Sequence, residues 1–120
     1  MNKKIALLLL GLLFFSSKLV AQTTPALSTQ ELVNLCQAPG TPENRSFCIG
    51  YSTAIYDTYL VTRHPVKAKH FICVKQPAPP IDTVISEFVN WANQNSQYLK
   101  MPAPDTAMRF LAQRFPCSGK

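Results

Sequence analysis

Four cysteines are the residues whose types and spacing indicate chemistry most clearly: Cys36, Cys48, Cys73 and Cys117. No C-x-x-C pair occurs, so the spacing does not indicate a thioredoxin-type redox site. An even number of cysteines in a small exported chain is typical of a disulfide framework, and four cysteines allow three pairings. The sequence therefore predicts two structural disulfides that stabilise a small domain.

The other reactive groups form no catalytic or metal-binding motif. His64, His70 and Cys73 are residue types that can bind zinc. Structural zinc sites usually combine two short ligand spacings, and only one, between His70 and Cys73, is present here. The six acidic residues are scattered, and no G-x-S-x-G, Walker or H-E-x-x-H motif occurs. We therefore expect no enzyme activity, no metal and no cofactor, and a binding protein is the favoured class.

Residues 1–21 have the organisation of a cleaved signal peptide. Lys3 and Lys4 precede an apolar run over residues 5–15, and Ala21 offers a small residue for cleavage. The run is shorter than the roughly 20 residues that a membrane span requires. We expect residues 22–120 to be the exported domain, with no membrane attachment after cleavage.

The formal net charge of +6 on 120 residues does not indicate a nucleic-acid partner. Half of that excess is carried by three lysines of the export signal, Lys3, Lys4 and Lys18. Export also separates the domain from nucleic acid, so the sequence predicts no nucleic-acid binding.

Local signals place about four helices. Ser28 and Glu31 form a capping box that begins the first, which ends before Pro39-Gly40. Thr41 and Pro42 begin a second that runs to about residue 61. Its predicted inward stripe is Phe47, Tyr51, Ala54, Ile55 and Leu60.

Prolines and polar residues separate the later elements. Four prolines exclude a helix over residues 63–80, whereas residues 82–92 carry an apolar stripe of helical spacing that includes Trp91. A last helix begins near residues 104–105 and is stopped by Pro116. The sequence thus predicts an all-α, compact bundle of about four helices stapled by two disulfides, with a proline-rich connection between the second and third helices.

Gly50 lies in the middle of the second predicted helix, where glycine costs about 1 kcal/mol relative to alanine. Either a neighbouring element packs closely on the backbone there, or the glycine is a tolerated imperfection. We predict that Gly50 and Tyr51 are structural, and that Gly50→Leu overpacks a contact and lowers stability.

Several motifs appear in an order that resembles a known family. They are L-C-Q over residues 35–37, F-C-I-G-Y over 47–51 with Asp57 beyond it, F-I-C-V over 71–74, M-P-A over 101–103 and F-P-C over 115–117. This order is similar to the Rap/Tai-type immunity proteins of type VI secretion systems. Within it we interpret Phe47, Gly50, Tyr51, Asp57, Trp91, Phe115 and Pro116 as structural motif residues.

The resemblance implies an all-helical periplasmic protein, often a homodimer. Such proteins bind a toxic effector protein, here expected to be a cell-wall amidase with a cysteine–histidine site, and occlude its cleft. Two alternatives stay open: a small periplasmic stress chaperone, and an envelope ligand-binding module that stacks aromatic residues on sugars.

The helix order also favours one disulfide pairing. Cys36 ends the first helix and Cys48 lies in the second turn of the next, so these ends lie close in an antiparallel pair. We predict Cys36–Cys48 and Cys73–Cys117. The alternative, Cys36–Cys117 with Cys48–Cys73, holds if residues 64–73 run back along the second helix.

Two connections stiffened by proline could contact an effector: residues 63–80 and residues 93–104. The first is basic and could steer towards an acidic effector rim, and it is slightly favoured. The candidate effector-binding residues are His64, Lys67, Lys69, His70, Lys75, Gln97 and Tyr98.

Overall fold

A computed structural model of the chain describes residues 25–62 and 69–118. These residues form four α-helices and one short 3₁₀ helix, with no strand among them beyond an isolated bridge between Ser28 and Pro102. The helices are α2 (Thr29–Cys36), α3 (Pro42–Thr62), α4 (Ile81–Gln94) and α5 (Ala103–Arg114), and η2 (Ser96–Tyr98) follows α4. The all-α fold is confirmed. The predicted signal peptide lies outside the described residues.

The N-terminus of α2 is fixed by local and distant partners. Ser28 and Glu31 form the predicted capping box, in which the Ser28 backbone N–H donates to Glu31 Oε2 at 2.9 Å. Hydrogen bonds from the Ser28 side chain, and then from its backbone, lower the pKa of Glu31. The backbone N–H groups of Thr29 and Gln30 donate to the carbonyls of Met101 and Leu99.

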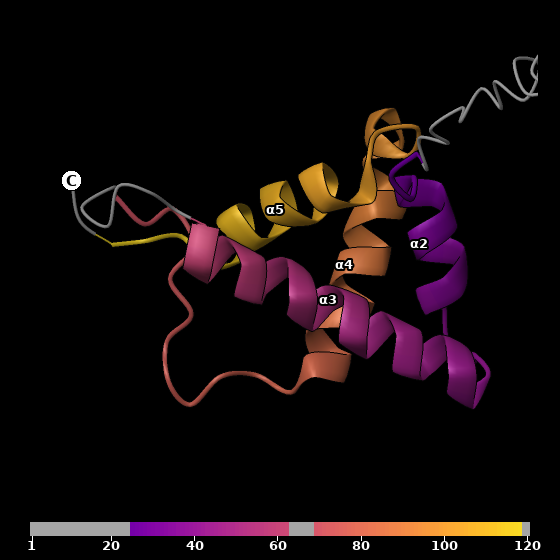
Figure 1. The fold of residues 1–120 in the computed structure, drawn as a ribbon, viewed down its shortest axis with the longest axis horizontal. Coiled ribbons are helices and arrows are strands. Elements are labelled where there is room, and N and C mark those ends of the chain that lie inside the picture. Colours follow the sequence, from indigo (N-terminus) through magenta and orange to yellow (C-terminus); the bar gives the residue numbers. More distant parts are fainter. Residues whose placement is uncertain (1–24, 63–68, 119–120) are drawn as a thin grey trace, which may run out of the picture.

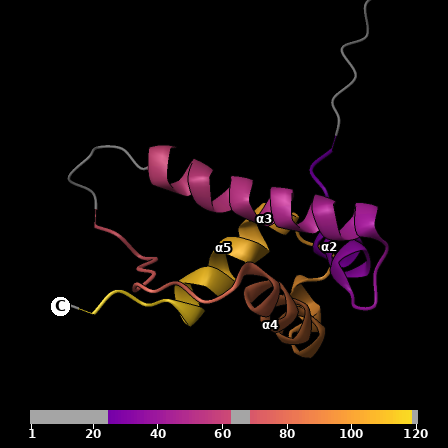
Figure 2. The ribbon, with the colours of Figure 1, turned by 90° about the horizontal axis from the view of Figure 1, so that it is seen from below.

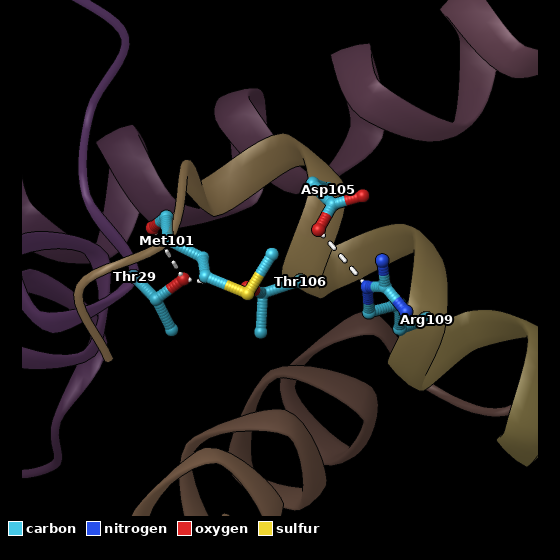
Figure 3. Close-up of polar contacts among 5 residues, drawn as sticks. All are labelled: Thr29, Met101, Asp105, Thr106 and Arg109. Atoms are coloured by element: carbon cyan, nitrogen blue, oxygen red, sulfur yellow. Dashed lines mark hydrogen bonds and ion pairs between the residues drawn. The ribbon is translucent and has the colours of Figure 1, made fainter. Parts of the chain in front are cut away.

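A buried polar contact completes this junction between α2 and α5 (Figure 3). The Thr29 hydroxyl donates to the Met101 carbonyl at 3.0 Å and lies 2.8 Å from the Thr106 hydroxyl. Since a hydroxyl carries one proton, Thr106 donates to Thr29 in this arrangement. Both threonines are fully buried, so the Thr106 hydroxyl depends on Thr29 for its hydrogen bond, and the Thr29 hydroxyl depends on both Thr106 and the Met101 carbonyl.

The main core lies where α2, α4 and α5 meet, with α3 laid across them (Figures 1 and 2). Leu32 and Val33 of α2 pack against one face of α4 and the first half of α5. The buried members of this core are Leu32, Val33, Phe88, Val89, Ala92, Ala103, Ala107 and Phe110. A second cluster joins Tyr59, Ile72 and Phe115 near the end of α3.

Both predicted disulfides are confirmed. Cys36 at the end of α2 pairs with Cys48 in α3, and Cys73 pairs with Cys117 beyond α5. The first disulfide fixes α3 against α2. The second, with a 2.8 Å hydrogen bond from the Cys73 N–H to the Phe115 carbonyl, ties the segment after α3 to the end of α5.

The predicted inward stripe of α3 is wrong for three of its five residues. Phe47, Ala54 and Leu60 are exposed, whereas the buried residues of α3 are Cys48 and Tyr59. This helix carries apolar residues around most of its circumference, so periodicity alone does not select an inward face. The Cys36–Cys48 disulfide helps to select it by holding Cys48 towards α2.

Of the two alternatives for Gly50, the structure agrees with a tolerated imperfection, and the overpacking expected for Gly50→Leu has no contact in the monomer to act on. Gly50 is exposed, and a Cβ built on it meets nothing within 4 Å. The physical reason is the rotation of α3, which turns Gly50 away from α2, α4 and α5. A larger residue at this position has space within the monomer.

The remaining differences are small. Helix α4 begins at Ile81 and α5 at Ala103, each one residue before the predicted range, with Pro80 and Pro102 at the N-cap positions. The polar stretch after Trp91 continues α4 to Gln94 and then forms η2, which sequence reasoning did not predict.

Candidate functional site

The basic segment after α3 is anchored by its backbone and exposes its charged side chains. The buried Tyr59 hydroxyl accepts hydrogen bonds from the backbone N–H groups of Phe71 at 3.1 Å and Ile72 at 3.2 Å. With the Cys73–Cys117 disulfide, these bonds hold the segment on the adjoining ends of α3 and α5. The exposed candidate residues here are Lys69, His70 and Lys75. Two further candidates, His64 and Lys67, lie outside the described residues.

The other two candidate residues lie on η2. Gln97 is exposed, whereas Tyr98 is half-buried and stacks on Trp91, with ring centroids 5.5 Å apart and planes 9° from parallel. The Trp91 Nε1–H donates to Gln113 Oε1 at 2.9 Å. Tyr98 is therefore part of a packed aromatic pair as well as a surface residue.

A charged pair extends this aromatic surface. The Arg109 guanidinium lies 5.8 Å from the centre of the Tyr98 ring, within the range of a cation–π contact. Its Nε donates to Asp105 at 2.9 Å (Figure 3). This hydrogen bond, with the charge of Asp105, raises the pKa of Arg109. Tryptophan, tyrosine and arginine dominate binding energy in protein interfaces, so this surface is suited to a protein partner.

The structure does not bring the two candidate surfaces together. The Cys73 N–H donates to the Phe115 carbonyl and so holds the basic segment at the C-terminal end of α5. The other element, η2, leads into the N-terminal end of α5, and its Tyr98 carbonyl accepts a hydrogen bond from the Met101 N–H. Helix α5 has 12 residues and is therefore about 18 Å long. The 3₁₀ helix η2 and the basic segment therefore meet α5 at opposite ends (Figures 1 and 2), although Trp91, on which Tyr98 stacks, reaches along the helix to Gln113.

An apolar cleft lies beside the basic segment and was not predicted. It has a volume of about 190 Å³ and is enclosed by α3, the segment before α4, α4 and α5. No charged residue lines it, so it can accept an apolar side chain but no ion. The sequence feature that could have indicated this cleft is the group of apolar residues at the start of α4. The lining includes Ile55, Tyr56, Val74, Pro79, Ile81, Val84, Phe88 and Leu111.

A second unpredicted feature is the outward side of α3. Phe47 remains 42% exposed and Val61 71% exposed, and Phe47 stacks on Tyr51 with centroids 5.4 Å apart. Ala54 lies between them and also lines a groove between α3 and α5. Asp57 is exposed on the same helix. The sequence feature that could have indicated these exposed apolar residues is that α3 has more apolar residues than one buried face can hold.

The last motif residues lie at the end of α5. Phe115 is buried in the second cluster, and the Arg114 guanidinium lies 4.9 Å from the centre of its ring. Arg114 also pairs with Glu87 of α4 at 2.7 Å. Pro116 follows Phe115, the C-cap of α5, where the helix was expected to stop.

The disulfides occupy the cysteines that a metal site would need as thiolate ligands. Cys73 is bonded to Cys117, so the zinc alternative with His70 loses its thiolate ligand. Within residues 25–62 and 69–118, no three histidine, cysteine or acidic side chains come together in a way that could hold a metal ion. No described helix is long and apolar enough to cross a membrane.

Comparison with known proteins gives one match. A family model described as Rap1a immunity proteins matches residues 28–117, a stretch that holds the four described α-helices and both disulfides. No curated protein and no solved structure matches this chain.

Proposed function

The chain belongs to the family of Rap1a immunity proteins, and on that premise we propose that it binds and neutralises a toxic type VI secretion effector in the periplasm. The observation that carries this proposal is the extent of the family match, which runs from the capping box of α2 to the last cysteine. Neutralisation by binding also agrees with the sequence, in which no nucleophile–base pair or paired carboxylates suggest catalysis.

Two features support a periplasmic site of action. Both disulfides need an oxidising compartment in which to form and persist. Residues 1–21 have the charge and hydropathy order of a cleaved export signal. An effector that attacks the cell wall acts in the same compartment.

The proposed target is a peptidoglycan amidase, and the proposed mechanism is occlusion of its active-site cleft. The motif order resembles immunity proteins that act in this way. The basic segment offers charge for steering, and the nearby apolar cleft could receive a side chain of the effector. The resemblance also implies a homodimer.

Co-production in a susceptible Gram-negative host tests the function. The full chain is produced with each member of a panel of exported type VI amidases, and growth is compared with a variant that lacks residues 2–21. Protection against one amidase by the exported chain alone is the expected result.

Binding must accompany that protection. The purified oxidised protein should form a complex with the same amidase and inhibit its hydrolysis of peptidoglycan. If it protects against no amidase and binds none of the panel, the amidase target is wrong. If it protects without export, the periplasmic site of action is wrong.

A further inference from the structure

The apolar cleft has a buried floor and an exposed rim. Phe88 of α4 lines the floor with Phe110 and Phe115, and all three are buried. Thr53 of α3 and Ile81 at the start of α4 also line the cleft and are exposed. An apolar cavity of about 150 Å³ holds one benzene ring, so a cleft of about 190 Å³ has room for a single large apolar side chain.

A second hollow adjoins the cleft and carries positive charge. This hollow, here called the basic hollow, shares Pro79 and Phe115 with the cleft and is also lined by Lys75 and Arg114. Among the described residues, no aspartate or glutamate lines either hollow. Arg114 is paired with Glu87 at 2.7 Å, whereas Lys75 is exposed and takes part in no ion pair of the described residues. Lys75 can therefore meet a carboxylate that lies beside an occupant of the cleft.

One wall of the cleft can adjust to its occupant. Residues 74–79, here called the strap, run as a loop towards the start of α4 (Figure 1), and Val74 and Ala78 of the strap line the cleft. The Cys73–Cys117 disulfide holds one end of the strap, and α4 holds the other. Among the described residues, no backbone hydrogen bond joins the strap to a helix. The strap can therefore move against α3 and α5 without breaking such a bond.

We propose that the cleft and the basic hollow together bind one short segment of the effector, whose large apolar side chain enters the cleft while a neighbouring carboxylate pairs with the Lys75 ammonium. This role rests on the proposed function and extends it. Docking is assigned to the C-terminal end of α5, and the effector must present an acidic residue beside an aromatic or branched apolar one.

The chemistry of the two hollows selects this occupant. Pockets for small-molecule ligands usually measure about 300–1,000 Å³, so a cleft of about 190 Å³ fits one side chain better than a lipid or a cofactor. The positive charge of the basic hollow favours an acidic neighbour and disfavours a basic one. An apolar anchor in a desolvated pocket supplies affinity, and a charge pair at its edge supplies association rate and specificity.

Titration with a small mimic tests the site without an effector. The probes are 3-phenylpropionate, which joins one ring to one carboxylate, and its neutral amide, followed by backbone amide NMR of the oxidised protein. Both should shift the signals of cleft residues such as Ile85 and Leu111. The carboxylate should bind roughly two- to fivefold more tightly at low ionic strength, the range of an exposed ion pair. That preference should disappear in Lys75→Gln and remain in Lys100→Gln.

Substitutions at the rim should block the cleft. Thr53→Trp places a ring at its mouth, whereas Ala54→Trp is a matched control at the next exposed position of α3, which does not line the cleft. We expect Thr53→Trp to lose binding of both probes and Ala54→Trp to retain it, with unchanged helical circular dichroism. Ala78→Trp fills the cleft from the strap and should also lose binding. Probes that leave the cleft signals unshifted, or that bind both blocked variants as they bind wild type, would overturn the proposal.

An amidase that the wild-type protein binds tests the occupant. Thr53→Trp should weaken that complex at least about tenfold, as loss of an anchor does, and Ala54→Trp should not. An excess of 3-phenylpropionate should compete with the amidase. Equal affinity of wild type and Thr53→Trp would overturn the proposed docking site and leave the proposed function intact. If wild type binds no amidase of the panel, the amidase target fails, and the occupant proposed for the cleft fails with it.

Discussion

At the scale of single residues, the structure decides between the two explanations of Gly50, close packing and a tolerated imperfection. A glycine inside a helix suggested close packing, and within the monomer nothing packs on it. What remains inside the monomer is the intrinsic cost of glycine in a helix. Overpacking would make a larger residue at position 50 destabilising. Because nothing packs on Gly50, we instead expect replacement by alanine to be stabilising.

Gly50→Ala should raise the free energy of unfolding by about 0.5–1 kcal/mol, because alanine restricts the unfolded chain and has free space in the folded one. Urea unfolding of Gly50→Ala against wild type measures this change. A loss of stability would mean that an element of the monomer does pack against Gly50.

The buried pair Thr29 and Thr106 gives a second residue-scale prediction. Thr29→Val removes the hydroxyl that serves both the Met101 carbonyl and Thr106, so it should destabilise the protein by about 1–3 kcal/mol. Thr53→Val, at an exposed position, is the control. Both are measured by urea unfolding.

The two threonines should also be coupled. In Thr29→Val/Thr106→Val no hydroxyl of the pair is left buried without a partner, so the combined loss should be smaller than the sum of the single losses. Strict additivity in this double-mutant cycle would show that the 2.8 Å contact between the hydroxyls contributes nothing.

At the scale of elements, the two disulfides join different parts of the fold and close loops of different length. Cys36–Cys48 closes a loop of sequence separation 12 between consecutive helices. Cys73–Cys117 spans a separation of 44 and joins the segment after α3 to the chain beyond α5. The longer loop removes more entropy from the unfolded chain.

The paired variant Cys73→Ala/Cys117→Ala should therefore lose more stability than Cys36→Ala/Cys48→Ala. The chain-entropy model gives losses of about 4 and about 3 kcal/mol for the two. Urea unfolding of both variants against wild type measures the order. A reversed order would show that rotation of α3, fixed by the first disulfide, matters more than loop entropy.

At the scale of the whole molecule, η2 and the basic segment meet α5 at opposite ends, about 18 Å apart, and they offer different chemistry to an effector. The unpaired positive charge of the described basic segment lies at the end with Phe115, close to the apolar cleft. The η2 end instead offers the Trp91–Tyr98–Arg109 surface. Their different chemistry allows a kinetic distinction.

Matched charge reversals separate the two ends. We expect Lys75→Glu to slow association with the effector at low ionic strength and to weaken its salt dependence, with little change in melting temperature. Lys100→Glu, an exposed lysine just beyond η2, should change the rate much less. Stopped-flow association measures both. The opposite order would place docking at the η2 end.

The sequence by itself determined the features that depend on neighbouring residues. The Ser28 capping box, the start of α3 at Pro42 and the end of α5 before Pro116 follow from local hydrogen bonding and proline geometry. The sequence also favoured the observed disulfide pairing, because a short Pro-Gly connection brings Cys36 and Cys48 close together, but it left Cys36–Cys117 with Cys48–Cys73 open.

Only the tertiary structure decided which side of α3 faces inward. Apolar residues surround much of this helix, so burial of one side or another gains similar free energy, and local periodicity cannot choose between them. Contacts distant in sequence make the choice, among them the Cys36–Cys48 disulfide and the packing of Tyr59 with Ile72 and Phe115. They leave Phe47, Gly50 and Val61 outside, and they bring η2 and the basic segment to opposite ends of α5.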